Sequence, residues 1–302
     1  MATTFQQRLQ AQNVKAAAKK YELVKDETIT VSGVTLYRIR ALVKINIRKY
    51  VIGPGALGGF IQSEKNLSQK GGSWVHDDAR VYGKAVVEGD AIVYNSARVY
   101  GQARVSEKAV VLGKAQVYDN AKVSGNARIK DLGRVFENAV VKSGRVWKKG
   151  KVRGSAMVTA DGTVTDNGTL AGEATLTGGY VGGNAQVYGK AKIWYECAIG
   201  GNAKVYDNAK IYGYAIVLAE AEVYGNARVF GMAAVQGNAH VLGDAQIFGS
   251  AEIEGNAIIG GNAKVYDKAF VKDNGKVYDN AEVGGKTLVK GDQVVSGDQV
   301  LK

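Results

Sequence analysis

The most regular feature of the chain is an alanine at every sixth position, with a valine or isoleucine four residues before each alanine. One run of these alanines extends from Ala79 to Ala127, and a second run of twelve extends from Ala203 to Ala269. A period of six fits neither a straight α-helix nor the two-residue alternation of a flat strand. It fits a hexapeptide solenoid, in which three six-residue sides make one triangular coil.

The residue types of the repeat agree with their places in such a coil. The large aliphatic residue fills the interior, and the alanine is small because it points inward close to a corner, where a larger side chain would overfill the core. Gly and Asn precede it because both tolerate left-handed backbone angles. We therefore predict an all-β protein, a left-handed parallel β-helix of about twelve coils with a small N-terminal helix and a β-hairpin capping module.

The repeat divides the chain into four parts. Residues 1–20 form a basic helical extension, and residues 21–74 form a capping module with a hairpin from Glu27 to Ile39 that turns at Ser32 and Gly33. Residues 75–284 form the β-helix, and residues 285–302 lose the alanine and are predicted to be a charged C-terminal cap. Both caps are expected because open β-helix ends would polymerise.

The phase of the repeat slips by one residue near Ser155 and again near Gly183, within a stretch where several alanines are replaced by glycine. We interpret residues 142–183 as irregular but continuous coils that contain a bulge or a small loop.

Composition narrows the functional classes. The formal net charge is +12, and residues 1–50 hold ten Lys or Arg against three acids, so the excess is concentrated at the N-terminus. A basic protein of this kind tends to bind nucleic acid, anionic polymers or an acidic protein. The alternative that the positive charge serves only to keep the protein soluble is equally open. The single cysteine, Cys197, stands at an alanine position, so it is expected to be a small core residue without a disulfide partner.

Residues 1–20 are polar and lack the apolar core of a signal peptide, and no apolar run is long enough for a membrane span. We expect the protein in the cytoplasm, which is the host cytoplasm if the chain is phage-encoded, or in association with a virion. No membrane partner is expected.

The N-terminal module carries a resemblance to a known family. Its segments Tyr37–Leu42, Leu57–Ile61, Asn66–Gln69 and Ser73–Val75, followed directly by Asp78–Gly83, resemble hexapeptide-repeat proteins found in enterobacteria and very widely in phages and prophages. Members are labelled acyltransferases or polymer-forming proteins by analogy of fold. The resemblance covers residues 21 to about 290. It implies a left-handed β-helix and a phage or prophage context, and it carries no catalytic residue.

An acyltransferase is the enzyme alternative. Such enzymes use a histidine in a cleft between the subunits of a trimer, and this chain has only His76 and His240. His76 lies at the entry to the first coil, next to Asp77 and Asp78, and His240 lies among regular coils without an inserted loop. Catalysis is the less favoured interpretation for each, because a general base needs a shaped site around it. Acetyl-CoA is expected as a cofactor only under this alternative, and no metal site is predicted, because two distant His and one Cys have no ligand spacing.

Residues 18 apart should stack in columns on one face of the rod. Three aromatic columns are predicted: Tyr82, Tyr100, Tyr118 and Phe136; Trp194, Tyr212, Phe230, Phe248 and Tyr266; and Tyr188, Tyr206 and Tyr224. Lys and Arg stand two residues before most members of the first two columns. Such stripes could track an anionic chain, but a duplicated repeat produces ladders without any ligand, and that second reading is favoured.

One patch departs from the repeat. Between Lys142 and Arg153 there are six basic residues and no acid. An irregular stretch with concentrated charge is the best candidate contact site for a phosphate-rich or acidic partner. The candidate binding residues are Lys142, Arg145, Trp147, Lys148, Lys149, Lys151 and Arg153.

Three functions follow in order of preference. The first is a non-enzymatic structural or binding solenoid, phage- or prophage-encoded, whose basic N-terminal segment docks to a protein partner such as a virion component. The second is a homotrimeric acyltransferase, and the third is a protein that binds nucleic acid or another anionic polymer.

Overall fold

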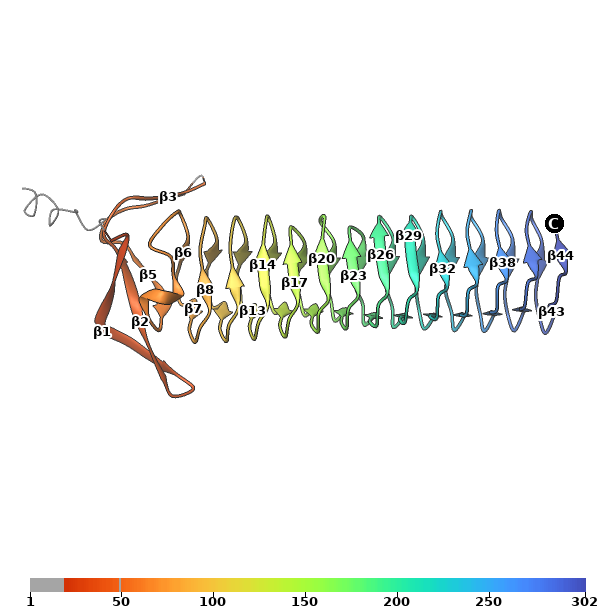
Figure 1. The fold of residues 1–302 in the computed structure, drawn as a ribbon, viewed down its shortest axis with the longest axis horizontal. Helices are drawn as coiled ribbons and strands as arrows, with labels where there is room; N and C mark the ends of the chain where they lie inside the picture. The colour runs from red at the N-terminus through yellow and green to blue at the C-terminus, as the bar shows by residue number, and fades with distance from the viewer. Residues whose placement is uncertain (1–18, 49) are drawn as a thin grey trace, which may run out of the picture.

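The computed structural model describes residues 19–48 and 50–302. It shows a parallel β-solenoid with an N-terminal module at one end of a long rod (Figure 1). The helix predicted within residues 1–20 falls on residues outside the described range. In the described part, no helix is long and apolar enough to cross a membrane.

The first sheet joins the N-terminal module to the rod. Its strands, in spatial order, are β1 (Tyr21–Val31), β2 (Val34–Ala41), β5 (Leu57–Ile61), β7 (Arg80–Val81), β10 (Arg98–Val99), β13 (Gln116–Val117), β16 (Arg134–Val135), β19 (Lys151–Val152), β22 (Thr169–Leu170), β25 (Gln186–Val187), β28 (Lys204–Val205), β31 (Glu222–Val223), β34 (His240–Val241), β37 (Ile258–Ile259), β40 (Lys276–Val277) and β43 (Val294–Val295).

The second sheet forms the next side of each coil. Its strands are β8 (Val86–Val87), β11 (Arg104–Val105), β14 (Lys122–Ser124), β17 (Val140–Lys142), β20 (Met157–Thr159), β23 (Thr175–Thr177), β26 (Lys192–Tyr195), β29 (Lys210–Gly213), β32 (Arg228–Val229), β35 (Gln246–Ile247), β38 (Lys264–Val265), β41 (Glu282–Val283) and β44 (Val300–Leu301).

The third sheet closes the triangle. Its strands are β6 (Trp74–Val75), β9 (Ile92–Val93), β12 (Val110–Val111), β15 (Arg128–Ile129), β18 (Arg145–Val146), β21 (Thr163–Val164), β24 (Tyr180–Val181), β27 (Ala198–Ile199), β30 (Ile216–Val217), β33 (Ala234–Val235), β36 (Glu252–Ile253), β39 (Phe270–Val271) and β42 (Leu288–Val289). Outside the three sheets are the hairpin of β3 (Ile45–Ile47) and β4 (Tyr50–Ile52) and the short 3₁₀ helix η1 (Glu64–Asn66).

The rod has thirteen coils, since β6 to β44 supply thirteen strands to each side, where about twelve were predicted. The difference arises at residues 285–302, which were predicted to be a cap. Their strands β42, β43 and β44 pair in parallel with β39, β40 and β41 and so form the last coil. The inward residues Val289, Val295 and Leu301 continue the coil without the alanine.

The inward aliphatic side chains form one continuous core along the rod. From Val75 to Val283 every one of them has no exposed surface, and Cys197 is equally buried in an alanine position, as predicted. Complete burial of a valine or leucine side chain contributes roughly 1.5–3 kcal/mol. The repeated inward valine is therefore the main source of the rod's stability.

The corners are held by polar side chains that bond from one coil to the next. Asp119 has a left-handed backbone (φ 55), and its carboxylate accepts a hydrogen bond from the amide of Glu137 at 3.0 Å. The side-chain amide of Asn238 donates to Asn256 at 3.1 Å, and that of Asn256 donates to Asn274 at 3.1 Å. The asparagines therefore form hydrogen-bonded ladders along this corner.

The phase slips are single-residue deletions, and the predicted bulge or loop is wrong. Val141 and Val146 begin consecutive sides only five residues apart, and so do Leu176 and Val181. Both short sides lie at the corner between the second and third sheets. Gly144 replaces the alanine in the first of them, because an added Cβ would lie 2.4 Å from Cγ1 of Val158. A methyl group would fit at this position only if Val158 moved.

The N-terminal module extends the first sheet beyond the rod. The predicted hairpin is confirmed, with β1 and β2 antiparallel around Ser32 (φ 48) and Gly33 (φ 77). β5 pairs antiparallel with β2 on one side and parallel with β7 on the other. The β3–β4 hairpin buries Ile47 completely, and beyond it the Arg48 side chain donates to the carbonyl of Lys108.

Candidate functional site

The predicted basic patch does not form one surface. Lys142 ends a strand of the second sheet. Arg145 lies in a strand of the third sheet and Trp147 directly follows that strand, whereas Lys151 lies in a strand of the first sheet and Arg153 directly follows it. Consecutive residues of a solenoid run around the rod, so these twelve residues reach parts of three sides. Each member of the patch has its nearest outward neighbours in the coils before and after it.

On the third sheet, Trp147 is covered by a lysine from the preceding coil. Nζ of Lys130 lies 4.1 Å from the centroid of the Trp147 ring, a cation–π distance. In the described chain, the indole Nε1 of Trp147 is buried without a hydrogen-bond partner. Arg145 lies in register with Arg128 and forms an ion pair with Asp161 at 3.6 Å. Trp147 and Arg145 are thus both engaged within the rod.

At the corner between the third and first sheets, Lys148 is paired with an acid. Its Nζ lies 2.6 Å from Oδ1 of Asp166, whose Oδ2 accepts a hydrogen bond from the phenol of Tyr180 at 2.7 Å. Hydrogen bonds from Lys148 and then from Tyr180 lower the pKa of the Asp166 carboxyl. Burial, followed by this hydrogen bond, raises the pKa of Tyr180 to about 12. Lys148 is therefore the least available cation of the predicted patch.

On the first sheet, Lys151 continues a long basic column. The column follows the strand register through Arg80, Arg98, Gln116, Arg134 and Lys151. In residues 19–48 and 50–302, none of its four cations forms an ion pair. By contrast, Lys204 farther along the first sheet and Lys264 on the second sheet each bond a glutamate at 2.8 Å. The column is a stripe of free positive charge along one side of the rod; we call it the basic stripe.

An aromatic column runs beside the basic stripe. The rings of Tyr82, Tyr100, Tyr118 and Phe136 are stacked with centroids 4.9–5.2 Å apart. Tyr188, Tyr206 and Tyr224 are stacked in the same way, with centroids 4.9–5.0 Å apart. These stacks were predicted as two separate columns, but strand register places both on the first sheet in one column. In a count of 18 residues per coil, the two stacks are offset by two positions, and the two single-residue deletions remove this offset. Arg153 and Ala171 occupy the two positions of the column between the stacks.

A groove of about 380 Å³ opens where the aromatic column is interrupted. The residues that line it include Glu137, Arg153, Thr169, Ala171, Gln186 and Tyr188. The Glu137 carboxylate accepts a hydrogen bond from the amide of Gly154 at 2.6 Å, so this acid stabilises the backbone of the next corner. The sequence pattern missed this groove, and the only signal for it was the pair of five-residue sides.

A second groove, of about 740 Å³, lies beside the second deletion. It is lined by Thr177, Gly178, Gly179, Lys192 and Trp194, among others. Trp194 begins the predicted column on the second sheet, which is confirmed, since its rings stack down to Tyr266 with centroids 4.4–5.2 Å apart. Lys192, Lys210 and Arg228 form a shorter set of unpaired cations beside this column in the described chain.

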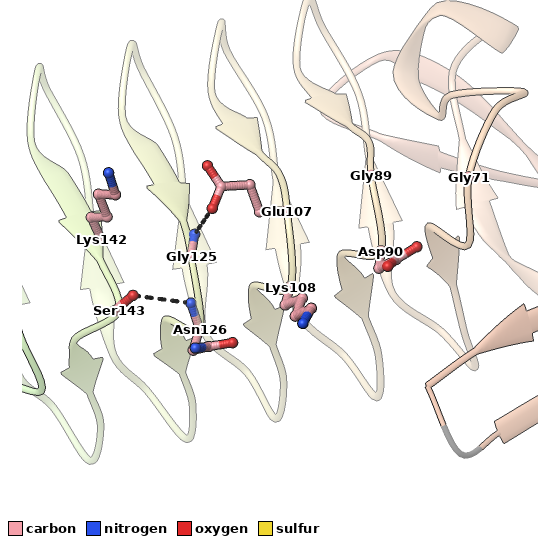
Figure 2. Close-up of a pocket in the computed structure, with 9 residues that line it drawn as sticks. All are labelled: Gly71, Gly89, Asp90, Glu107, Lys108, Gly125, Asn126, Lys142 and Ser143. Atoms are coloured by element: carbon pink, nitrogen blue, oxygen red, sulfur yellow. Dashed lines mark hydrogen bonds between the residues drawn. The ribbon is translucent and has the colours of Figure 1, made fainter.

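A third groove, of about 450 Å³, follows the corner between the second and third sheets as far as the first deletion (Figure 2). Its polar groups serve mainly the backbone. The Glu107 carboxylate accepts from the amide of Gly125 at 2.9 Å, and the Ser143 hydroxyl accepts from the amide of Asn126 at 3.2 Å. Lys142 lines this groove, away from the other residues of the predicted patch.

The two histidines lie apart from all three grooves. His240 is a half-buried outward residue of the first sheet, edge-on to Tyr224 with centroids 6.4 Å apart. His76 lies edge-on to the buried Trp74, and burial lowers its pKa. Among the described residues, no group of three His, Cys, Asp or Glu could hold a metal ion.

Comparison with known proteins supports the architecture. A family model described as the YdcK β-solenoid repeat matches residues 115–131, about one coil of the rod. A search of characterised proteins finds no match to this chain. The matched coil carries Gln116 of the basic stripe and Tyr118 of the aromatic column, so the candidate surface lies on repeat units of this kind.

Proposed function

We propose that this chain is a non-enzymatic binding solenoid that holds an extended anionic polymer along its first sheet. The proposal rests on one observation, the basic stripe of Arg80, Arg98, Arg134 and Lys151 without acidic partners in the described chain. Successive coils present the stripe at intervals close to the 4.9–5.2 Å that separates the stacked rings beside it. A rigid row of cations at this spacing favours a chain of regularly spaced anions, because counterions are released from both.

The surroundings of the stripe favour binding over a role in solubility alone. Cations that serve only solubility are commonly interspersed with acids, and this rod pairs Lys204 with Glu222 and Lys264 with Glu282 on the same plan. The stripe omits those acids over five successive coils. In this proposal the rod is the binding element, and the basic N-terminal segment contributes a second point of attachment, to a protein partner such as a virion component.

The test is binding of the full chain to inorganic polyphosphate and to a single-stranded oligonucleotide, measured by fluorescence anisotropy over a range of salt concentrations. Each phosphate contact contributes roughly 0.7 to the slope of log K against log salt for single strands. A variant with Arg98→Gln, Arg134→Gln and Lys151→Gln should therefore lose about 2 from that slope and bind more weakly to both polymers.

The second sheet supplies a matched control. Lys192→Gln, Lys210→Gln and Arg228→Gln remove the same charge from residues that also flank stacked aromatic rings. This variant should keep most of the wild-type slope. Equal losses in the two variants would mean that net charge alone attracts the polymer, and the proposal for the first sheet would be wrong.

A further inference from the structure

The gap in the aromatic column has the dimensions of one missing ring. Strand register places Phe136, Arg153, Ala171 and Tyr188 at the same position in four consecutive coils. Below the gap, Tyr188 stacks on Tyr206 with centroids 5.0 Å apart. Ala171 is the only one of these positions without a planar group, so a slot of two ladder intervals separates Arg153 from Tyr188. A slot of that width accommodates one planar ring at ladder spacing.

A hydrogen-bonding group stands where such a ring would need it. In the stacked coils, the phenol of Tyr100 donates to Oε1 of Gln116 at 3.3 Å, and that of Tyr206 donates to Oε2 of Glu222 at 3.1 Å. In both cases the acceptor lies on the strand of the following coil. Gln186 holds the corresponding position relative to Ala171. A ring in the slot would therefore have its outer edge at the Gln186 amide, which can both donate and accept.

The polar groups of the slot are free. In the part of the chain that the structure describes, neither the Arg153 guanidinium nor the Gln186 side-chain amide has a hydrogen bond or an ion pair. Ala171 is 7% exposed at the floor of the groove, between two exposed polar side chains. Lys151 and Arg134 lie next to the slot on the same sheet.

We propose that this slot binds the base of a single-stranded nucleic acid whose phosphates follow the basic stripe. The base takes the place of the missing ring, with one face on the phenol of Tyr188 and the other against the Arg153 guanidinium. Stacking on an aromatic face with arginine on the opposite side is a sequence-tolerant way to hold a base. The Gln186 amide meets the hydrogen-bonding edge of the base. Lys151 and Arg134 meet the phosphates on the N-terminal side of the slot.

This inference rests on the proposed function and narrows it to one class of polymer. Nucleic acid is favoured over other polyanions because a ligand that fits the slot needs three properties: a planar ring, a hydrogen-bonding edge and an attached anion. Sulfated sugars and polyphosphate lack the planar ring.

The experiment compares a fluorescent homopolymer oligonucleotide with an abasic strand of the same length and charge, using the full chain. Wild-type protein should bind the base-bearing strand roughly ten-fold more tightly, the effect of one stacked base. Ala171→Tyr should abolish this preference and leave binding of the abasic strand unchanged, because its own phenol fills the slot. The fold should persist, since tyrosine occupies this position in the coils of Tyr188 and Tyr206. Circular dichroism and thermal unfolding verify that.

Leu242→Tyr is the matched control, because it adds the same side chain to the same column away from the slot. It should retain the ten-fold preference. A wild-type protein that binds both strands equally, or an Ala171→Tyr variant that keeps the preference, overturns the slot while polyphosphate binding still supports the basic stripe. Absence of binding to every polyanion overturns both proposals.

Discussion

We predict that an alanine cannot replace Gly144 in the short side without destabilising the core. In Gly144→Ala, the new methyl group would lie 2.4 Å from Cγ1 of Val158 and 3.0 Å from the carbonyl oxygen of Gly162. Atoms this close must move apart, and overfilling a packed core typically destabilises a protein by about 1–3 kcal/mol. We expect a loss of that size in the free energy of unfolding, measured by urea denaturation followed by circular dichroism.

A second substitution shows whether the contact with Val158 is the cause. Val158→Ala removes the clashing methyl groups and by itself should cost about 2 kcal/mol through lost burial and a cavity. In the double variant, the methyl group introduced by Gly144→Ala occupies the space that the valine side chain vacates. The combined cost should therefore be smaller than the sum of the two single costs by at least about 1 kcal/mol.

Gly133→Ala provides the control for this cycle. Its added Cβ would meet the backbone oxygen of Val146 at 2.6 Å, a contact that a change at position 158 cannot relieve. Its cost should add to that of Val158→Ala. If the costs of Gly144→Ala and Val158→Ala were also strictly additive, the explanation of the glycine by crowding against Val158 would be refuted.

Three further predictions concern titration and reactivity. Burial, followed by the phenols stacked on either side, raises the pKa of Tyr100 to about 12 from an ordinary value of 10.0. The resulting contribution to the stability of the folded state is complete below pH 10 and should be lost as the pH rises from 10 toward 12. Alkaline denaturation followed by tyrosinate absorbance would detect this loss. Burial lowers the pKa of Lys20 to about 8 from 10.5; the folded state then binds fewer protons, so stability should rise between pH 8 and 10.5, and Lys20→Met should remove this rise. Burial raises the pKa of the Cys197 thiol to about 11, so a thiol reagent should leave it unmodified in the folded rod and label it in urea; rapid labelling without urea would contradict the buried position.

The architecture could be predicted from the order of residue types because the contacts that build a solenoid are local. Each inward valine and alanine marks one side of a coil in the sequence. Each coil contacts only the coils before and after it, so the fold can be predicted without knowledge of long-range contacts. The hairpin at Ser32 and Gly33, the buried position of Cys197 and the stacking within each aromatic column followed from the same local rules. The last coil was missed because residues 285–302 keep the inward valines without the alanine, and the alanine was taken as the mark of a coil.

Which residues share a surface depends on how successive coils pair. A count of 18 residues per coil fails at the two five-residue sides, where a deletion shifts every later residue by one position in the stack. Only the strand pairing joins the stack at Tyr82 to the stack at Tyr188 and places Ala171 in the gap between them. The same geometry separates the predicted basic patch, because neighbours in sequence run around the rod while neighbours in space lie one coil apart. The repeat could therefore be predicted from residue types. The candidate site could not, because it depends on the register between coils, and that register is set by strand pairing.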